Sequence, residues 1–211
     1  DLDVDFTKPK YHFDKSIYDK RVYNGYGKAD SSVDLKFGPG IVDWPSMVAL
    51  PENVLLRVAS EIHDPVTTTD ELIPSGETSS YRSNPLALSE FTLSRKDPAY
   101  VGRAKEMLTV EKARRDGADP TAENEAVKAA FAKIQEKWAD VVPAKTGIGT
   151  TIFAEKPGDG SAREQAASCQ KVLGGWANIA REYATKRYRS NLINWGMLPF
   201  VIEKGELPFG L

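Results

Sequence analysis

The chain has 211 residues, of which 41% are hydrophobic and 27% charged, and its formal net charge is -2. These totals fit one large domain, or one domain with a long arm, of an ordinary globular protein. They exclude a strong overall field that favours nucleic acid or membranes, so we expect neither as a partner. The single cysteine, Cys169, excludes an internal disulfide and a cysteine metal cage within this chain, and it favours a reducing, cytoplasmic compartment.

The first 50 residues are rich in tyrosine, glycine and charge and have no sustained periodicity. This composition is too aromatic for simple disorder. We interpret residues 1–50 as an extended arm or interdomain linker, with a partly ordered terminus as the equal alternative, and residues 51–211 as the compact domain. Because the chain begins at Asp1 without a methionine, we expect it to be either processed or, preferably, part of a longer protein.

Residues 54–59, Val-Leu-Leu-Arg-Val-Ala, predict a buried strand. The prolines, glycine and threonine cluster of residues 63–76 predict an irregular loop, which continues into the polar segment around Arg82. Loops of this length inside a compact domain are commonly functional. His63 beside Asp64 is either a base or, as we prefer, a loop histidine that is bonded locally.

Two helices are expected next. Asp97-Pro98 and Asp119-Pro120 each place an N-cap residue before a proline at the first helical position, and Gly117 is suited to end the first helix. The second helix carries an apolar face that we expect in the core, formed by Val127, Phe131, Ile134 and Trp138.

The rest of the chain alternates between strands and helices. Strands are expected at residues 150–154, 176–180 and 197–202, and helices at residues 161–173 and 182–195. Glycines follow both helices, as is typical of helix C-termini. The alternation predicts the α/β class.

Residues 158–165, Gly-Asp-Gly-Ser-Ala-Arg-Glu-Gln, are the stretch around which the chain is organised. Ser161 and Glu164 have the spacing of a capping box at a helix start. The two glycines are expected to turn the backbone sharply and to leave room for a ligand. Arg163 adds its charge to the positive end of the helix dipole, so an anion is expected to offset it. The pattern predicts a carboxylate or phosphate site at a helix N-terminus.

Other chemistries fit this stretch less well. Arg163 stands where a nucleophile elbow needs a glycine, and the Gly-Lys-Ser/Thr of a nucleotide-binding loop is missing. Cys169 lies inside a predicted helix and is interpreted as a packing residue. Arg82 and Arg163, with Ser161 and the helix N–H groups, fit a clamp for a di- or tricarboxylate, because guanidinium groups bind carboxylates bidentately.

Residues 54–200 resemble the fourth, swivelling C-terminal domain of the aconitase superfamily. The resemblance rests on Thr68-Thr69-Asp70 after a strand, on Arg82 at the family's distance from it, and on residues 158–164, which resemble Gly-x-Gly-Ser-Ser-Arg-Glu. Further matches follow in the expected order, at Leu173-Gly174-Gly175, Ser190-Asn191-Leu192 and Gly196-Met197-Leu198-Pro199. Within the superfamily the chain is most similar to bacterial aconitate-hydratase-like hydratases. The resemblance implies a swivelling β/β/α domain, here with an extended N-terminal arm.

The resemblance also implies a function, that of a hydro-lyase that hydrates or dehydrates a hydroxy di- or tricarboxylate. In the family a [4Fe-4S] cluster lies on the other domains, in the same polypeptide or on a large subunit, and this chain would bind no metal. Arg82 and Arg163 would bind the small hydroxy-carboxylate substrate, and Ser161 would form a hydrogen bond near it. Asp70 would support the site, which makes Ser161 and Asp70 the catalytic candidates. The chain alone is expected to be inactive.

One departure from the family lies at the serine that removes the substrate proton, because that position is Ala162 here. A methyl group cannot accept a proton. Glu71 replaces the family's histidine after Thr-Thr-Asp. Three explanations are open: another base, with Glu71 and Asp159 nearest along the chain; a base from the other domains that removes a different proton; or binding without turnover. The last makes a non-catalytic carboxylate-binding module the second hypothesis. RNA binding, known elsewhere in the superfamily, is disfavoured by the acidic balance.

Overall fold

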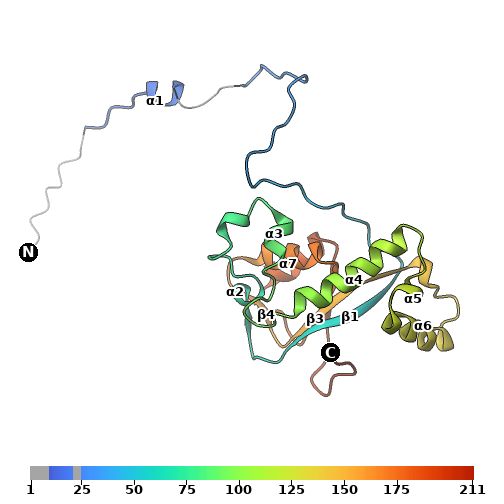
Figure 1. The fold of residues 1–211 in the computed structure, drawn as a ribbon. Coiled ribbons are helices and arrows are strands. Elements are labelled where there is room, and N and C mark those ends of the chain that lie inside the picture. The colour runs from blue at the N-terminus through green and yellow to red at the C-terminus, as the bar shows by residue number, and fades with distance from the viewer. Residues whose placement is uncertain (1–9, 21–24) are drawn as a thin grey trace, which may run out of the picture. The chain divides into compact units, whose positions relative to one another are not determined.

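The computed structural model describes residues 10–20 and 25–211. The chain divides into two compact units, Asp1–Phe37 and Gly38–Leu211. In its described part the first unit contains one short helix, α1 (Ser16–Asp19), which buries none of its residues. The second unit carries the remaining helices and strands (Figure 1).

The second unit is built on a four-stranded parallel sheet in the order β1-β3-β5-β6. Its strands are β1 (Asn53–Ile62), β3 (Thr146–Ala154), β5 (Gly175–Ala180) and β6 (Leu198–Val201). The central strand β3 is buried along its whole length, as expected where a parallel sheet is covered by helices. The strands predicted in these four regions and the α/β class are confirmed.

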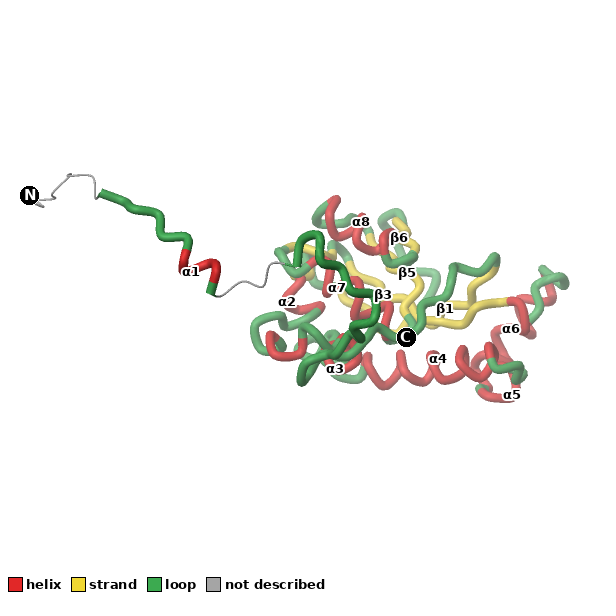
Figure 2. The backbone as a smooth tube through the Cα atoms, turned by 90° about the horizontal axis from the view of Figure 1, so that it is seen from above, coloured by secondary structure: helices red, strands yellow, loops and turns green. Residues whose placement is uncertain are grey.

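Helices connect the parallel strands. The longer ones are α4 (Tyr100–Arg115), α6 (Glu125–Lys137), α7 (Arg163–Val172) and α8 (Lys186–Asn194). The shorter ones are α2 (Thr69–Leu72), α3 (Pro85–Ser89) and α5 (Pro120–Glu123), with 3-10 turns η1 (Ser79–Tyr81) and η2 (Pro143–Lys145). Helix α4 runs alongside β1 and β3, whereas α7 and α8 pack against each other and reach β5 and β6 (Figure 2).

A closed ring of hydrogen bonds joins α7, β5 and α8 inside the core. Gln170 donates to the hydroxyl of Tyr188 over 3.0 Å, Tyr188 donates to Asn178 Oδ1 over 2.7 Å, and Asn178 donates to Gln170 Oε1 over 2.7 Å. All three side chains are buried. Because every member of the ring both donates and accepts, this polar network fixes the three elements in one arrangement.

A buried carboxylate joins α4 to the start of β3. Glu111 is 1% exposed, and its two oxygens accept from Nε and Nη2 of Arg114, each over 2.8 Å. Glu111 Oε2 also accepts from the backbone N–H of Ile148 over 2.8 Å. A charge removed from water needs such partners, so Glu111 holds the helix to the sheet at one place.

One of the two predicted helix starts differs from the structure. Asp119 caps α5 as predicted by accepting from the N–H of Thr121 over 2.9 Å. Asp97 does not cap α4, whose N-cap is Ala99, because its carboxylate instead accepts from the Ser60 hydroxyl and pairs with Arg103. The contact of Asp97 with Ser60 of β1 has therefore replaced the local cap of α4.

The prediction that Trp138 lies in the core is wrong. Trp138 is the C-cap of α6 and is 52% exposed, whereas Val127 and Phe131 of the same face are buried. The backbone leaves the helical region at Trp138 (φ -132°, ψ 78°), so the ring no longer continues the apolar face. It packs against the ammonium of Lys137 at 4.7 Å instead.

The segment that precedes β1 lies along the second unit. The N–H of Val42 donates to the carbonyl of Ser83 over 2.9 Å, and the rings of Trp44 and Trp195 lie 4.7 Å apart. These contacts concern residues 38–50, the part of the predicted arm that belongs to this unit. Across the described residues, no helix combines the length and apolarity that crossing a membrane requires.

Candidate functional site

A second, two-stranded sheet brings the two predicted motifs together. Strand β2 (Thr67–Thr68) pairs in parallel with β4 (Pro157–Asp159), with Thr67 opposite Pro157 and Thr68 opposite Asp159. The Thr-Thr-Asp motif therefore lies beside the loop that leads into α7. Nothing local in the sequence encodes this pairing.

The two glycines of the loop are required by the protein's own side chains. Gly158 has φ +96°, and a Cβ there would lie 2.3 Å from Cγ of Tyr188. Gly160 has φ +129°, and a Cβ there would lie 2.2 Å from Oγ1 of Thr69. The predicted sharp turn is confirmed by these positive φ angles, which favour glycine. The expectation that both glycines leave room for a ligand is wrong, because Tyr188 and Thr69 fill that space.

The predicted capping box at Ser161 and Glu164 is also wrong. Helix α7 begins at Arg163, its N-cap is Ala162, and no side chain caps it. Ser161 thus lies one residue before the cap, and Glu164 Oε1 accepts instead from Nε1 of Trp195 over 3.1 Å. The N–H groups at the start of α7 consequently have no side-chain acceptor from a capping residue.

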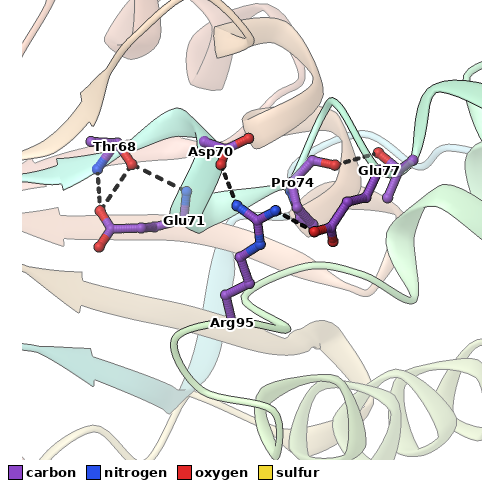
Figure 3. A network of polar contacts seen from close by, with 7 residues as sticks. Thr68, Asp70, Glu71, Pro74, Glu77 and Arg95 are labelled. Atoms are coloured by element: carbon purple, nitrogen blue, oxygen red, sulfur yellow. Dashed lines mark hydrogen bonds and ion pairs between the residues drawn. The ribbon is translucent and has the colours of Figure 1, made fainter.

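A complete capping box occurs at the neighbouring helix α2 (Figure 3). Oγ1 of Thr68 accepts from the N–H of Glu71 over 3.2 Å, and Glu71 Oε2 accepts from the N–H and hydroxyl of Thr68 over 2.7 and 2.9 Å. Lys96 donates to Glu71 Oε1 over 3.2 Å. Burial raises the pKa of Glu71, but the hydrogen bonds from Thr68 and Lys96 outweigh it, and the net pKa is lowered. Both carboxylate oxygens of Glu71 already accept hydrogen bonds, which argues against Glu71 as a base.

Asp70 lies at the start of α2, next to the capping box, and is exposed. Its carboxylate is 2.5 Å from Nη1 of Arg95, whose Nη2 is 2.5 Å from Glu77 Oε1 (Figure 3). Arg95 thereby bridges α2 and the loop that follows it. In that loop Thr78 donates to the carbonyl of Pro74 over 2.9 Å, so the segment leading to Arg82 is tied at two points.

A cavity of about 310 Å³ lies where this loop meets the start of α7, and we refer to it as the Arg82 cavity. Its lining combines two predicted site residues, the alanine that departs from the family, and three residues that were not predicted as site residues: Arg82, Ser161, Ala162, Ser75, Glu164 and Gln165. Arg82 donates to the carbonyl of Ser75 over 3.4 Å and pairs with no carboxylate of the described residues. Glu164 and Gln165 belong to the stretch 158–165, and their place in it was the one signal available for them.

Arg163 lies at the first position of α7 and is half-buried. It does not line the Arg82 cavity. Its Nε is buried without a hydrogen-bond partner, and within residues 10–20 and 25–211 no carboxylate pairs with its guanidinium. Arg163 thus lies two residues after Ser161 along the chain but does not line the cavity that Ser161 and Arg82 share.

The described residues do not fit an iron–sulfur cluster or another metal centre. Among residues 10–20 and 25–211, no group of three or more His, Cys, Asp and Glu side chains could hold a metal ion. Cys169 is buried in α7, and burial raises the pKa of its thiol to about 12, which opposes the thiolate that a metal needs.

The fold is that of a parallel α/β domain with a glycine-rich loop at the start of a helix. Residues 101–205 match the family described as the aconitase C-terminal domain. The chain therefore carries the swivel domain of the aconitase superfamily and belongs to that superfamily, which is a family of hydro-lyases. The match includes residues 158–164, whereas Asp70 and Arg82 lie before it. No curated protein matches the chain.

Proposed function

We propose that this domain closes over the active site of a hydro-lyase that adds water to, or removes water from, a hydroxy di- or tricarboxylate. The observation that carries the proposal is the Arg82 cavity, where Arg82, Ser161 and Ala162 meet. A carboxylate fits the three groups that meet there. They are the Arg82 guanidinium, which has no ion pair in the described residues, the Ser161 hydroxyl and the uncapped N-terminus of the ten-residue helix α7. The site is completed by cluster-bearing domains, in the same polypeptide or on a separate subunit.

Each residue of the clamp has a distinct role in this proposal. Arg82 binds one substrate carboxylate through its two terminal nitrogens, and Ser161 donates a hydrogen bond beside it. Arg163 binds a second carboxylate, because its guanidinium lacks a carboxylate partner among the described residues. Asp70 acts indirectly, through Arg95, by holding the loop that carries Arg82.

A group other than Ala162 must remove the substrate proton. Ala162 lines the cavity but cannot accept a proton. Glu71 already receives three hydrogen bonds from Thr68 and Lys96, and Asp159 is exposed at the end of β4 and does not line the cavity. Glu164 does line it, so we propose Glu164 as the group on this chain that takes the substrate proton.

The superfamily implies a [4Fe-4S] cluster in the complete protein, where it would polarise the substrate hydroxyl. The described residues of this chain do not fit it, as shown above, so the cluster belongs to the other domains in this proposal. The work of this chain is to bind the carboxylates, orient them and exclude water on closing.

The proposal is tested with Arg82→Gln in the complete protein, by following the ultraviolet absorbance of the unsaturated acid with citrate and isocitrate as probes. A bidentate charge-assisted contact is worth about 1.5–3 kcal/mol, so kcat/KM should fall by roughly 10- to 150-fold. Arg57→Gln is the matched control, because Arg57 pairs with Glu106 away from the cavity and should leave kcat/KM unchanged. Equal losses in both variants would refute the role of Arg82.

A second candidate function is a carboxylate-binding module without turnover, which Ala162 specifically favours. Turnover by the unmodified complete protein separates the two. Glu164→Gln then locates the base, because loss of a general base lowers kcat by about 10²- to 10⁴-fold. If the unmodified complete protein binds citrate but does not convert it, and Ala162→Ser gains activity, the module is the correct description. If activity is present and Glu164→Gln leaves it intact, the base comes from the other domains.

A further inference from the structure

A second cavity, of about 320 Å³, lies between α4, the end of α7 and the extended segment 45–48, and we refer to it as the Lys171 cavity. Three basic side chains line it: Lys112 and Arg115 from α4, and Lys171 from α7. No acidic side chain of the described residues lines it. It shares no lining residue with the Arg82 cavity.

Lys171 is the unusual member of this lining. Its side chain is 8% exposed, and its Nζ is buried with no hydrogen-bond partner in the described part of the chain. The ammonium lies over the ring of Trp176 at 4.2 Å. A cation–π contact stabilises the charge, but it satisfies none of the three N–H donors. A buried ammonium without an acceptor is costly, so this position favours an anionic acceptor.

The helix ends do not account for this arrangement. All three basic residues lie in the last turns of helices, where the dipole favours cations. That effect explains exposed lysines such as Lys112, which keep their hydration. It does not explain why the ammonium of Lys171 gives up water without gaining a carbonyl or carboxylate.

The surplus charge of the cavity indicates what the ligand is. Arg115 is partly neutralised, because its Nε is 3.2 Å from Glu111 Oε1. Lys112 and Lys171 pair with no carboxylate of the described residues, so at least two positive charges remain, because Arg115 shares Glu111 with Arg114. A phosphate group carries about -1.5 to -2 at neutral pH and three acceptor oxygens, so it matches both the charge and the number of donors better than one carboxylate does.

We propose that the Lys171 cavity binds a phosphate group, either as free phosphate or as a small phosphomonoester. The phosphate oxygens accept from Lys171 and Lys112, and the apolar side chains of Met47, Leu108 and Trp176 contact the remainder of a phosphomonoester. Because segment 45–48 forms one wall, the bound phosphate also fixes the segment that precedes β1 against α4 and α7. The site is independent of the proposed hydro-lyase chemistry.

The test is thermal unfolding of the 211-residue chain with inorganic phosphate, phenyl phosphate and chloride at matched ionic strength. Phosphate should raise Tm in a saturable way that chloride does not reproduce, because a ligand that binds only the native state stabilises it. Lys171→Met should weaken the phosphate affinity at least about tenfold, and in the absence of phosphate it should not lower Tm, because it removes an unpaired buried charge.

Two further variants keep the proposal falsifiable. Lys112→Met changes an exposed residue of the cavity and should also weaken phosphate binding, even if Lys171→Met does not fold. Lys145→Met, at an exposed lysine outside the cavity, is the control and should bind as the unmodified chain does. Tighter binding of phenyl phosphate identifies a monoester as the ligand, and equal binding identifies free phosphate. No saturable effect of either, or equal affinities in Lys112→Met and Lys145→Met, would overturn the site.

Discussion

The contact between Gly160 and Thr69 can be tested by Gly160→Ala. An alanine Cβ would lie 2.2 Å from Oγ1 and 3.3 Å from Cβ of Thr69, which is 3% exposed. The backbone at Gly160 has φ +129°, which side chains rarely adopt. The substitution should therefore force the loop before α7 away from α2, and Ser161 with it.

The expected loss of stability has two parts. Backbone strain in a sparsely populated region costs about 1–3 kcal/mol. Overpacking against a buried side chain costs a further 1–3 kcal/mol, approximately. Gly205→Ala isolates the first part, because Gly205 has φ +138° and a Cβ there would meet nothing within 4 Å. The clash with Thr69 is the difference between the two variants.

Urea unfolding of the two variants, followed by circular dichroism, gives the two free energies of unfolding. A double-mutant cycle with Thr69→Ala gives the coupling, since removal of Oγ1 takes away the closest atom. Gly160→Ala should lose at least about 1 kcal/mol more than Gly205→Ala, and most of that excess should disappear in the Thr69→Ala background. Equal losses at Gly160 and Gly205, or an unchanged excess in the double mutant, would refute the contact.

Two other predictions concern buried groups. Glu111→Gln should lower the free energy of unfolding by about 3–5 kcal/mol, because it leaves the Arg114 guanidinium without its carboxylate, whereas Glu106→Gln, at a half-exposed partner of Arg57, should cost less than about 1 kcal/mol. Burial raises the pKa of Cys169 to about 12, so iodoacetamide at pH 8 should label the native thiol roughly a thousandfold more slowly than the urea-unfolded thiol. The raised pKa of Cys169 stabilises the native state fully below the unfolded pKa of about 8.5, and this stabilisation is lost as pH rises toward 12. The free energy of unfolding of Cys169→Ala should therefore fall less steeply in that range than that of the unmodified chain.

These two predictions have clear negative outcomes. Similar losses for Glu111→Gln and Glu106→Gln in urea unfolding would show that the buried carboxylate is not an anchor between α4 and β3. Rapid labelling of native Cys169, or parallel pH curves for the unmodified chain and Cys169→Ala, would show that the thiol is not held away from water.

Local sequence patterns predicted the secondary structure well where no tertiary contact competes with them. The apolar run at 54–59 lies within β1, and the glycines at 117, 174 and 196 follow helices with positive φ. The same patterns failed where a tertiary contact competed with them. The carboxylate of Asp97 contacts Ser60 and Arg103 and does not cap α4. The backbone becomes non-helical at Trp138, so its ring does not join the apolar face of α6.

The capping boxes show the limit most clearly. Ser-x-x-Glu at Ser161 and Thr-x-x-Glu at Thr68 have the same spacing, yet a capping box forms only at Thr68 of these two. Gly160 lies against Thr69, which holds Ser161 outside α7 and leaves Ala162 at the cap. The result is an uncapped helix start that faces Arg82, which no local rule predicts.

The order of amino acids was enough to name the chemical groups of the candidate site. Arg82, Ser161 and Arg163 carry groups that are able to bind an anion, and Ala162 cannot accept a proton in any fold. Proximity is a different kind of property, because it depends on pairing between distant segments. The parallel contact of β2 with β4 and the close approach of Gly160 to Thr69 bring Arg82 and Ser161 to one cavity. Glu164 lies in the lining of that cavity, whereas Arg163 does not.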